Sequence, residues 1–217
     1  MSKQHPGLLR RSWRFLRKPS ARYSLLTLLL AGFFAGIVFW GGFNTGMEAT
    51  NQLGFCIGCH EMRDNVYKEY QQTIHYSNRT GVRAICSDCH VPREPWPLIR
   101  RKMQATFELI GHFRGVIDTR QKFEAERSEL AHHVWKRMKE TDSLECRNCH
   151  DARHMDPALQ SAGAQAKHKL METQGKTCID CHYGIAHNEP KGPTPEELYP
   201  NIKVQRWKEK PGDAPAT

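Results

Sequence analysis

The pentapeptide Cys56-Ile-Gly-Cys59-His60 recurs in related form three more times along this chain of 217 residues. The other copies are Cys86-Ser-Asp-Cys89-His90, Cys146-Arg-Asn-Cys149-His150 and Cys178-Ile-Asp-Cys181-His182. Together the four motifs contain all eight cysteines of the chain. The pattern C-x-x-C-H is typical of covalent haem attachment, in which both thiols bond the porphyrin and the histidine binds the iron. The sequence therefore predicts four covalently bound haem c groups.

Zinc knuckles and disulfide frameworks also contain paired cysteines. Neither kind of site requires a histidine directly after every second cysteine, whereas all four copies have one. The separation between Cys59 and Cys86 is also longer than the spacing within an ordinary zinc ribbon. Haem attachment is therefore the interpretation that accounts for all four motifs.

The amino-terminal part of the chain predicts a membrane anchor. Residues 1–22 contain seven lysines and arginines and no acidic residue, and the 21 residues 23–43 are uncharged. A helix of that length spans about 30 Å, the hydrocarbon thickness of a bilayer. The stretch ends in the aromatic cluster Phe39-Trp40-Gly-Gly-Phe43, not in the small-residue cleavage site of a secretory signal peptide.

The basic flank predicts that the amino terminus lies in the cytoplasm. We therefore expect a single-pass protein of the bacterial inner membrane whose haem domain is periplasmic. The flank supplies seven of the net +9 charges, which leaves 9 − 7 = +2 for the rest of the chain. The basic composition thus reflects membrane topology and does not indicate a nucleic-acid partner.

The composition of the outer part predicts a mainly α fold with extensive loops. Only 39% of the chain is hydrophobic, including the anchor, so a core made of protein alone would be thin. We expect the porphyrins to serve as the core of a multihaem cytochrome c domain. The periodic apolar residues Ile99, Met103, Phe107 and Ile110 predict a helix after a chain break at Pro92, Pro95 and Pro97. Further helices are expected from about 118 to 140 and between 157 and 175.

The motif spacing indicates an internal repeat. Fourteen residues separate His60 from His75, and 17 residues separate His150 from His168; the next motif then follows after 10 or 9 residues. A duplicated unit is the simplest explanation. The predicted tetrahaem domain, 44–192, would contain two dihaem units, about 50–92 and 142–190, joined by helices over 97–141 and followed by a Pro-rich tail, 193–217.

The repeat identifies His75 and His168 as equivalent candidates for distal ligands of haem iron. His187 follows His182 too closely to reach the opposite face of the same ring, so as a ligand it would serve a neighbouring haem. Adjacent His132 and His133 are predicted to lie on a solvated helix face. The weakest candidates are His5, His112 and His154.

Several segments together resemble one family. They are the anchor, Cys56-x-x-Cys59-His60-Glu-Met62, Thr73-Ile-His75-Tyr, the stretch from Gly81 to Pro92, Glu145 to His150, and Lys176 to His187. This combination resembles the NapC/NirT/NrfH family of membrane-anchored tetrahaem quinol dehydrogenases. The likeness extends to about Gly192 and is greatest to the branch that serves periplasmic nitrate reductase.

The resemblance implies that a membrane quinol, menaquinol or ubiquinol, is oxidised at haem 1 and that electrons pass to a periplasmic reductase. It implies that Met62 replaces His60 on haem 1, because the two residues are too close to bind opposite faces of one ring. It also implies a quinol site at Lys102 and Glu108, for which a solvated helix face is the simple alternative. The implied iron ligands are then Met62 or His60, with His90, His150 and His182 on one face and His75, His168 and His187 on the other.

Lys102 and Glu108 are six residues apart, so their side chains would point about 120° apart on a straight helix. Either the helix is interrupted near residues 104–106, or only one of the two contacts the quinol. Other functions remain open: a self-contained terminal reductase, such as a multihaem nitrite reductase; a general quinol-oxidising electron hub for several reductases; and the donor subunit of a cytochrome c nitrite reductase. A terminal reductase would need an open, substrate-binding haem in a deep pocket.

Overall fold

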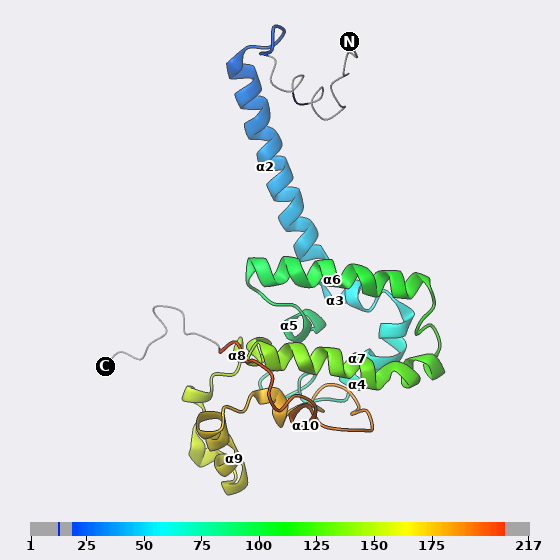
Figure 1. Ribbon diagram of the computed structural model, residues 1–217, viewed down its shortest axis with the longest axis vertical. Helices are drawn as coiled ribbons and strands as arrows, with labels where there is room; N and C mark the ends of the chain where they lie inside the picture. Colours follow the sequence, from blue (N-terminus) through cyan, green and yellow to red (C-terminus); the bar gives the residue numbers. More distant parts are fainter. Residues whose placement is uncertain (1–12, 14–18, 207–217) are drawn as a thin grey trace, which may run out of the picture. The chain divides into compact units, whose positions relative to one another are not determined.

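The computed structural model describes residues 13 and 19–206, and this part of the chain contains helices and no strands (Figure 1). The predicted mainly α fold class is confirmed. The chain divides into two compact units, Met1–Ala49 and Thr50–Thr217. The division lies six residues beyond the predicted end of the anchor.

The described part of the first unit is dominated by the helix α2 (Leu25–Ala49). Ser24 precedes it and its side chain accepts a hydrogen bond from the backbone N–H of Thr27, which satisfies one of the free donors of the first turn. The helix has 25 residues, and an 18-residue stretch of it has a mean hydropathy of 2.0. At about 1.5 Å per residue it exceeds the hydrocarbon thickness of about 30 Å, so it is long and apolar enough to cross a membrane.

In the second unit, each C-x-x-C-H motif lies on or beside a short helical segment. The helix α3 (Leu53–Cys56) ends at the first motif, α5 (Cys86–His90) spans the second, α8 (Leu144–Arg147) enters the third, and the 3₁₀ turn η4 (Cys178–Asp180) begins the fourth. Asp88 and Asp180, the aspartates shared by the second and fourth motifs, accept hydrogen bonds from the backbone N–H groups of Ile85 and Thr177. The repeated aspartate is thus a local cap of its loop.

Two long helices carry most of the remaining framework, α6 (Pro95–Phe113) and α7 (Arg120–Glu140) (Figure 1). The expected chain break before the first of them is wrong in detail, because Pro95 and Pro97 lie in the first turn of α6. Proline is tolerated there, since the N–H that it lacks would have no helical partner. Thr119 caps α7 by accepting a hydrogen bond from the backbone N–H of Lys122.

The apolar core is small. In the described residues the buried hydrophobic side chains are Tyr70, Phe123, Trp135, Met138 and Ile179. Three of these, Trp135, Met138 and Ile179, join α7 to the fourth motif. A buried ion pair between Lys139 and Asp180 (2.6 Å) reinforces the same junction.

The remaining elements extend from this framework. They are the π-helical turn η1 (Met62–Val66), α4 (Tyr67–Tyr70), the 3₁₀ turns η2 (Ala152–His154) and η3 (Pro157–Leu159), α9 (Ala162–Thr173), which carries His168, and α10 (Pro195–Leu198). The start of the predicted tail packs on α7, where the Tyr199 hydroxyl donates to the carbonyl of His132 (3.3 Å). The end of that tail and His5 lie outside the described residues.

Candidate haem-binding sites

The structure brings eight histidines together as four facing pairs. The ring centroids are 6.1 Å apart for His75 and His150, 6.1 Å for His90 and His187, 6.2 Å for His168 and His182, and 6.3 Å for His60 and His112. Each pair contains the histidine of one C-x-x-C-H motif. These near-equal separations come from histidines on unrelated segments, so they are not a consequence of local chain geometry.

The separations fit two imidazoles that share one metal. An imidazole nitrogen lies about 2 Å from a bound metal and about 1.1 Å from the centre of its own ring, so two ligands on opposite faces have centroids about 6.3 Å apart. All four observed distances lie within about 0.2 Å of this value. The residues present therefore fit four six-coordinate haem irons.

Two of the pairs cross between the predicted dihaem units. His75 of the first half faces His150 of the second, and His187 of the second half faces His90 of the first. By contrast, His168 faces His182 of its own half. His75 and His168 occupy equivalent positions in the sequence repeat, but they pair differently. His75 pairs with a histidine of the other half, whereas His168 pairs with one of its own half.

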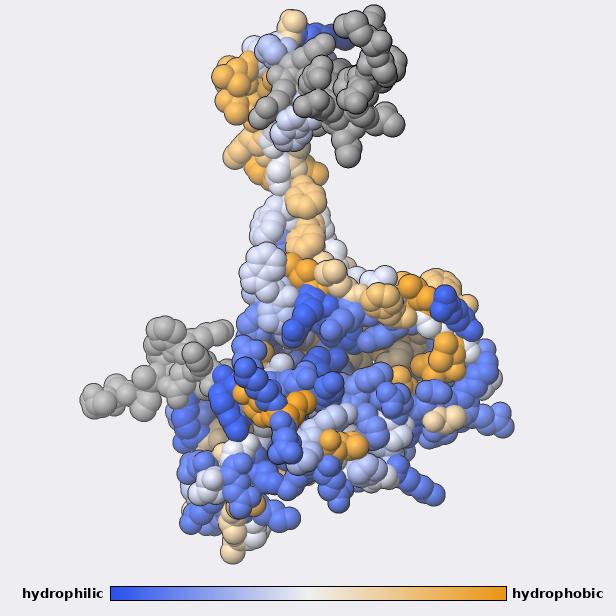
Figure 2. Space-filling view, in the orientation of Figure 1, coloured by the Kyte–Doolittle hydropathy of each residue, from blue (hydrophilic) through white to orange (hydrophobic). Residues whose placement is uncertain are grey.

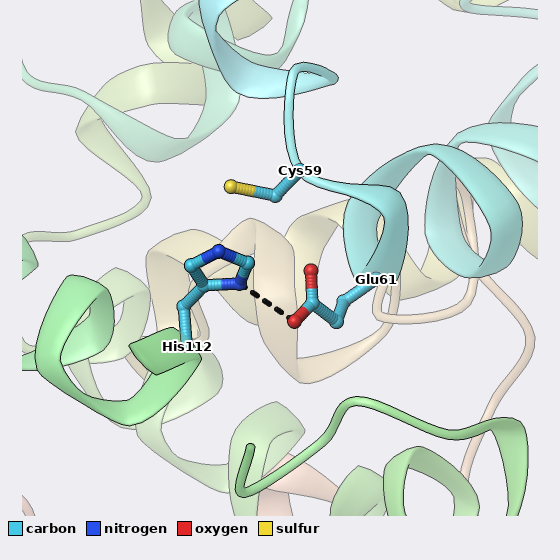
Figure 3. A group of neighbouring side chains, drawn as sticks. All are labelled: Cys59, Glu61 and His112. Atoms are coloured by element: carbon cyan, nitrogen blue, oxygen red, sulfur yellow. Dashed lines mark hydrogen bonds and ion pairs between the residues drawn. The ribbon is translucent and has the colours of Figure 1, made fainter. Parts of the chain in front are cut away.

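His112 is the functional candidate that sequence reasoning missed. It comes from the inward side of α6, and its Nδ1 donates a hydrogen bond to a carboxylate oxygen of Glu61 at 2.7 Å (Figure 3). One ring nitrogen of His112, the Cys59 sulfur and a carboxylate oxygen of Glu61 lie within 4.8 Å of one another. The ring thus lies beside the first attachment motif. The sequence did contain one signal. On a helix, His112 lies on the side opposite the apolar stripe, so if the stripe faces outward, His112 faces the interior of the unit.

Glu61 is buried, with an exposed fraction of 4%. Burial by itself would raise the pKa of its carboxyl group, but backbone hydrogen bonding and the hydrogen bond and charge of His112 hold that pKa below its ordinary value. Its Oε1 atom also lies 3.6 Å from Nε2 of His60. The carboxylate therefore stays ionised and acts on the imidazoles at the first motif.

Met62, which the resemblance implies as a ligand of haem 1, lies between the first and second motifs. It lines a pocket together with Cys56, Cys86, His90 and His187. This pocket contains the histidine pair of the second motif and the first cysteine of the first motif. Methionine is a flexible apolar side chain suited to packing against a porphyrin.

The attachment motifs follow one another as neighbours in space. The Cys56 side chain lies beside that of Cys86, and the Cys146 side chain lies beside that of Cys178. The helix α5 of the second motif contacts α8 of the third. Groups attached at the four motifs would therefore form a continuous series from the first to the fourth.

Buried charges support the presence of anionic groups near the second motif. In the described residues, Nη1 of Arg101 and both Nε and Nη2 of Arg137 are buried without a hydrogen-bond partner. Burial, and then the charges of His187, Arg137 and Arg101, lower the pKa of His90 to about 3, which places both guanidinium groups near the iron-binding imidazole. A buried guanidinium requires an acceptor, and the propionates of a haem would supply one.

The two predicted quinol-site residues lie on different sides of α6. The helix is unbroken from Pro95 to Phe113. Of the two alternatives, an interruption near residues 104–106 is therefore absent, which leaves the one in which a single residue of the pair contacts the quinol. Nζ of Lys102 donates to the carbonyl and hydroxyl oxygens of Thr50 at 3.0 and 2.8 Å, and its charge acts on Cys56. Glu108 is exposed and pairs with Arg101 at 2.8 Å. Lys102 is therefore the one beside the first motif.

The other histidines lie away from the motif pairs. His133 is exposed and contacts Glu129 at 3.1 Å, and exposed His154 contacts Asp151 at 3.1 Å. His132 is half-buried, against Trp135 and 3.3 Å from the hydroxyl of Ser128.

Four facing histidine pairs, each containing one C-x-x-C-H motif, define a multihaem c-type cytochrome. The model of the NapC/NirT cytochrome c family, N-terminal region, matches residues 18–192, and the chain belongs to this family. It therefore carries four covalently bound haem c groups and is an electron-transfer component.

Curated relatives agree with this assignment. The chain is 56% identical over 189 residues to the cytochrome c-type protein NapC of Escherichia coli K12, which covers 87% of this chain and 94% of the relative. It is also 56% identical over 182 residues to the denitrification system component NirT of Stutzerimonas stutzeri, covering 84% and 90%. The cytochrome c-type protein TorC of Escherichia coli K12 is 43% identical over 183 residues, covering 84% of this chain and 47% of that protein. No solved structure matches the chain.

Proposed function

We propose that this protein is a membrane-anchored quinol dehydrogenase that oxidises menaquinol or ubiquinol and delivers the electrons to a periplasmic reductase, namely periplasmic nitrate reductase. The observation that carries the proposal is the set of four facing histidine pairs on a chain with a helix long enough to cross a membrane. Two histidines on each iron leave no position for a small substrate. This favours electron transfer over nitrite reduction by the chain itself.

The proposed haem ligands follow from the pairs. The first motif would use His60 and His112, the second His90 and His187, the third His150 and His75, and the fourth His182 and His168. The cysteines of each motif would form the thioether bonds. The position of Met62 in the pocket with His90 and His187 supports a packing role for this residue and His60 as the ligand of haem 1.

The haems, when bound, supply one-electron carriers. The protein's contribution is to hold these carriers in series, because the first cysteines of motifs one and two adjoin, α5 contacts α8, and the first cysteines of motifs three and four adjoin. Electrons from a donor at the first motif would therefore reach the fourth motif through neighbouring groups.

Quinol oxidation releases two protons with two electrons, so the site also needs groups that hold the quinol oxygen and accept protons. We propose Lys102 as the residue that orients the quinol oxygen, because its ammonium group lies beside the first motif and next to Thr50. Glu108 is the proposed proton acceptor implied by the family resemblance. Its exposed position and its pairing with Arg101 support this role less well.

The proposed topology has a cytoplasmic amino terminus and a periplasmic cytochrome unit in the bacterial inner membrane. It is supported by the seven basic residues in 1–22 and by the apolar helix α2 that follows. The quinol would then be met at the outer surface of the membrane, since α2 carries no haem motif.

The direct test is reconstitution of the full-length holoprotein into vesicles that contain reduced quinol, with periplasmic nitrate reductase outside. Nitrate should be consumed at the rate of haem reoxidation, and omission of the holoprotein should stop the reaction. Rapid nitrite reduction by the holoprotein alone, at about 1–10³ s⁻¹, would overturn the electron-donor proposal.

A second candidate is a hub that supplies several reductases. It is supported by the equal identity, 56%, to relatives named NapC and NirT, two different designations. The same vesicles distinguish the candidates when other periplasmic reductases replace nitrate reductase. A dedicated donor would reduce one of them well, whereas a hub would reduce several at comparable rates.

A further inference from the structure

The helix α6 has an apolar face that the described residues of its own unit leave uncovered. The side chains of Trp96, Met103, Phe107 and Ile110 are 80%, 67%, 75% and 41% exposed. At 100° per residue these four positions lie within about 60° of one another around the helix axis. Figure 2 shows hydrophobic atoms gathered along this helix on a unit whose visible surface is mostly hydrophilic.

Contacts on the opposite face fix the rotation of this helix. Arg101 donates to the carbonyl of His90 at 3.3 Å, and His112 donates to Glu61 at 2.7 Å. Both residues lie about 140–160° around the axis from Trp96. The helix cannot turn its apolar face inward without breaking the contacts at the first and second motifs, so this face needs a partner outside the unit.

The course of the chain indicates what that partner is. Residue 50 directly follows Ala49, the last residue of α2, and Lys102 of α6 is hydrogen-bonded to Thr50. If the hydrocarbon layer ends near Phe43, the six residues from 44 to 49 rise only about 9 Å along the helix. The polar headgroup layer on each side of a bilayer is about 5–8 Å thick. A helix that binds Thr50 is therefore held within reach of the lipid headgroups by chain length alone.

The charges on the same face fit a lipid surface. Arg100 and Arg114 are exposed and lie within about 40° of Trp96 around the axis. Long basic side chains beside an apolar face can extend to phosphates while their stems cover acyl chains, and aromatic residues favour the same layer. Basic residues beside an exposed apolar and aromatic face therefore fit an anionic lipid surface.

We propose that α6 is an interfacial helix, which lies in the plane of the membrane and buries Trp96, Met103, Phe107 and Ile110 among the headgroups and upper acyl chains of an anionic phospholipid bilayer. The proposal rests on the anchoring that is part of the proposed function. It adds that the cytochrome unit binds the membrane by a second, independent contact. Because Lys102 and His112 are on the same helix, this contact would hold the first motif at the level from which a quinol emerges.

Photo-crosslinking of the full-length holoprotein tests this directly. The photoreactive residue p-benzoylphenylalanine replaces Phe107 in one variant, Phe34 of α2 in a second, and Leu159 of η3 in a third. Phe34 reports on the anchor, and Leu159 is the matched control because it is apolar and 86% exposed, outside α6. Each variant is placed in bilayer discs of phosphatidylethanolamine and phosphatidylglycerol, irradiated and analysed by mass spectrometry for lipid adducts.

We expect lipid adducts at positions 34 and 107 and at least tenfold fewer at 159. Adducts at 34 without adducts at 107 would overturn the interfacial helix while leaving the anchor and the quinol function intact. Adducts between protein chains at 107 would overturn it in favour of an interface between copies. Absence of adducts at 34 would contradict the proposal that α2 spans the membrane. The interfacial helix would then be overturned as well. Retention of all four haems in each variant, read from the absorption spectrum, shows that the protein is folded.

Discussion

At the scale of single residues, the proposed ligand set of the first haem depends on His112. The family resemblance implies Met62 as a ligand, whereas in the folded chain the rings of His112 and His60 are separated by a distance that matches the other three pairs. Two imidazoles give a low-spin iron, because both are strong-field ligands. Quinol oxidation does not need an open iron position, since electrons can leave through the porphyrin edge.

We expect His112→Ala to convert one of the four haems to the high-spin form, because its iron loses a sixth ligand. Met62→Leu should leave all four haems low-spin. Electron paramagnetic resonance of the oxidised holoprotein measures both, with His133→Ala as a control at an exposed histidine. The opposite pattern, with the change caused by Met62 and none by His112, would restore methionine as the ligand.

Glu61 provides a second prediction at this scale. A carboxylate that accepts a hydrogen bond from Nδ1 of an iron-bound imidazole makes that ligand more basic and stabilises the oxidised iron. We therefore expect Glu61→Gln to raise the reduction potential of one haem by tens of millivolts while its low-spin spectrum is retained. A spectroelectrochemical titration measures this. Four unchanged potentials would show that the hydrogen bond has no influence on the haem.

At the scale of elements, α6 combines two functions on different faces. One face holds Lys102 and His112 at the first motif, and the other carries the exposed apolar residues. The long helix α7 has a structural function instead. It holds the fourth motif through Lys139 and Asp180, and it holds the segment after His187 through Arg127 and Glu69.

The quinol site gives a prediction for α6. Lys102→Gln should slow quinol oxidation by about 10²-fold, because the group that orients the quinol oxygen is lost from the first motif. Glu108→Gln, on the exposed side of the same helix, should slow it much less. Stopped-flow reduction of the holoprotein by quinol in vesicles separates the two variants. An unchanged rate in the Glu108 variant would remove that carboxylate as the proposed proton acceptor, and an unchanged rate in the Lys102 variant would reduce Lys102 to a structural residue.

The clamp between α7 and α4 predicts a stability effect. Arg127 donates to both oxygens of Glu69 at 3.0 and 2.5 Å, and Glu69 also accepts from the backbone N–H of Asn188, next to His187. Glu69→Gln removes one of the carboxylates that neutralise the buried guanidinium of Arg127. We therefore expect it to lower the free energy of unfolding by about 3 kcal/mol. Asp64→Asn, which breaks an exposed pair with Lys68, should change it by less than about 0.5 kcal/mol.

The same clamp has a defined pH dependence. Burial raises the pKa of Glu69, but the hydrogen bonds from Arg127 and Asn188 outweigh it, and the folded-state pKa lies below the ordinary value of about 4.3. A lowered folded-state pKa contributes stability that is present above the unfolded pKa and is lost as pH falls through the folded one. Denaturant unfolding at pH 7 and at pH 3 should therefore show a smaller difference for Glu69→Gln than for the unchanged protein.

At the scale of the whole molecule, the anchor and the cytochrome unit should be separable in function. The cytochrome unit is compact by itself. We expect a chain without residues 1–43 to retain four haems and to pass electrons from an artificial reductant to the partner reductase. It should lose most of its turnover with membrane quinol, because the bilayer no longer brings the substrate to the first motif. Undiminished turnover with membrane quinol would show that the anchor is dispensable for quinol access.

The sequence by itself determined the covalent chemistry. A C-x-x-C-H motif is local, so four copies are sufficient to establish four haem attachments, and a 21-residue uncharged stretch is sufficient to predict a membrane-spanning helix. Helix positions were also largely predictable, because caps such as Thr119 and periodic apolar residues act within a few residues of chain.

Only the tertiary structure decided which histidine faces which motif. His75 meets His150 and His187 meets His90 across the predicted repeat, and His112 meets His60 across more than fifty residues. The apolar stripe of α6 was equally ambiguous, since its period is the same whether it faces a core or a membrane. The partner of each histidine and the surroundings of the apolar stripe both depend on how distant segments pack together. No local sequence pattern determines either of them.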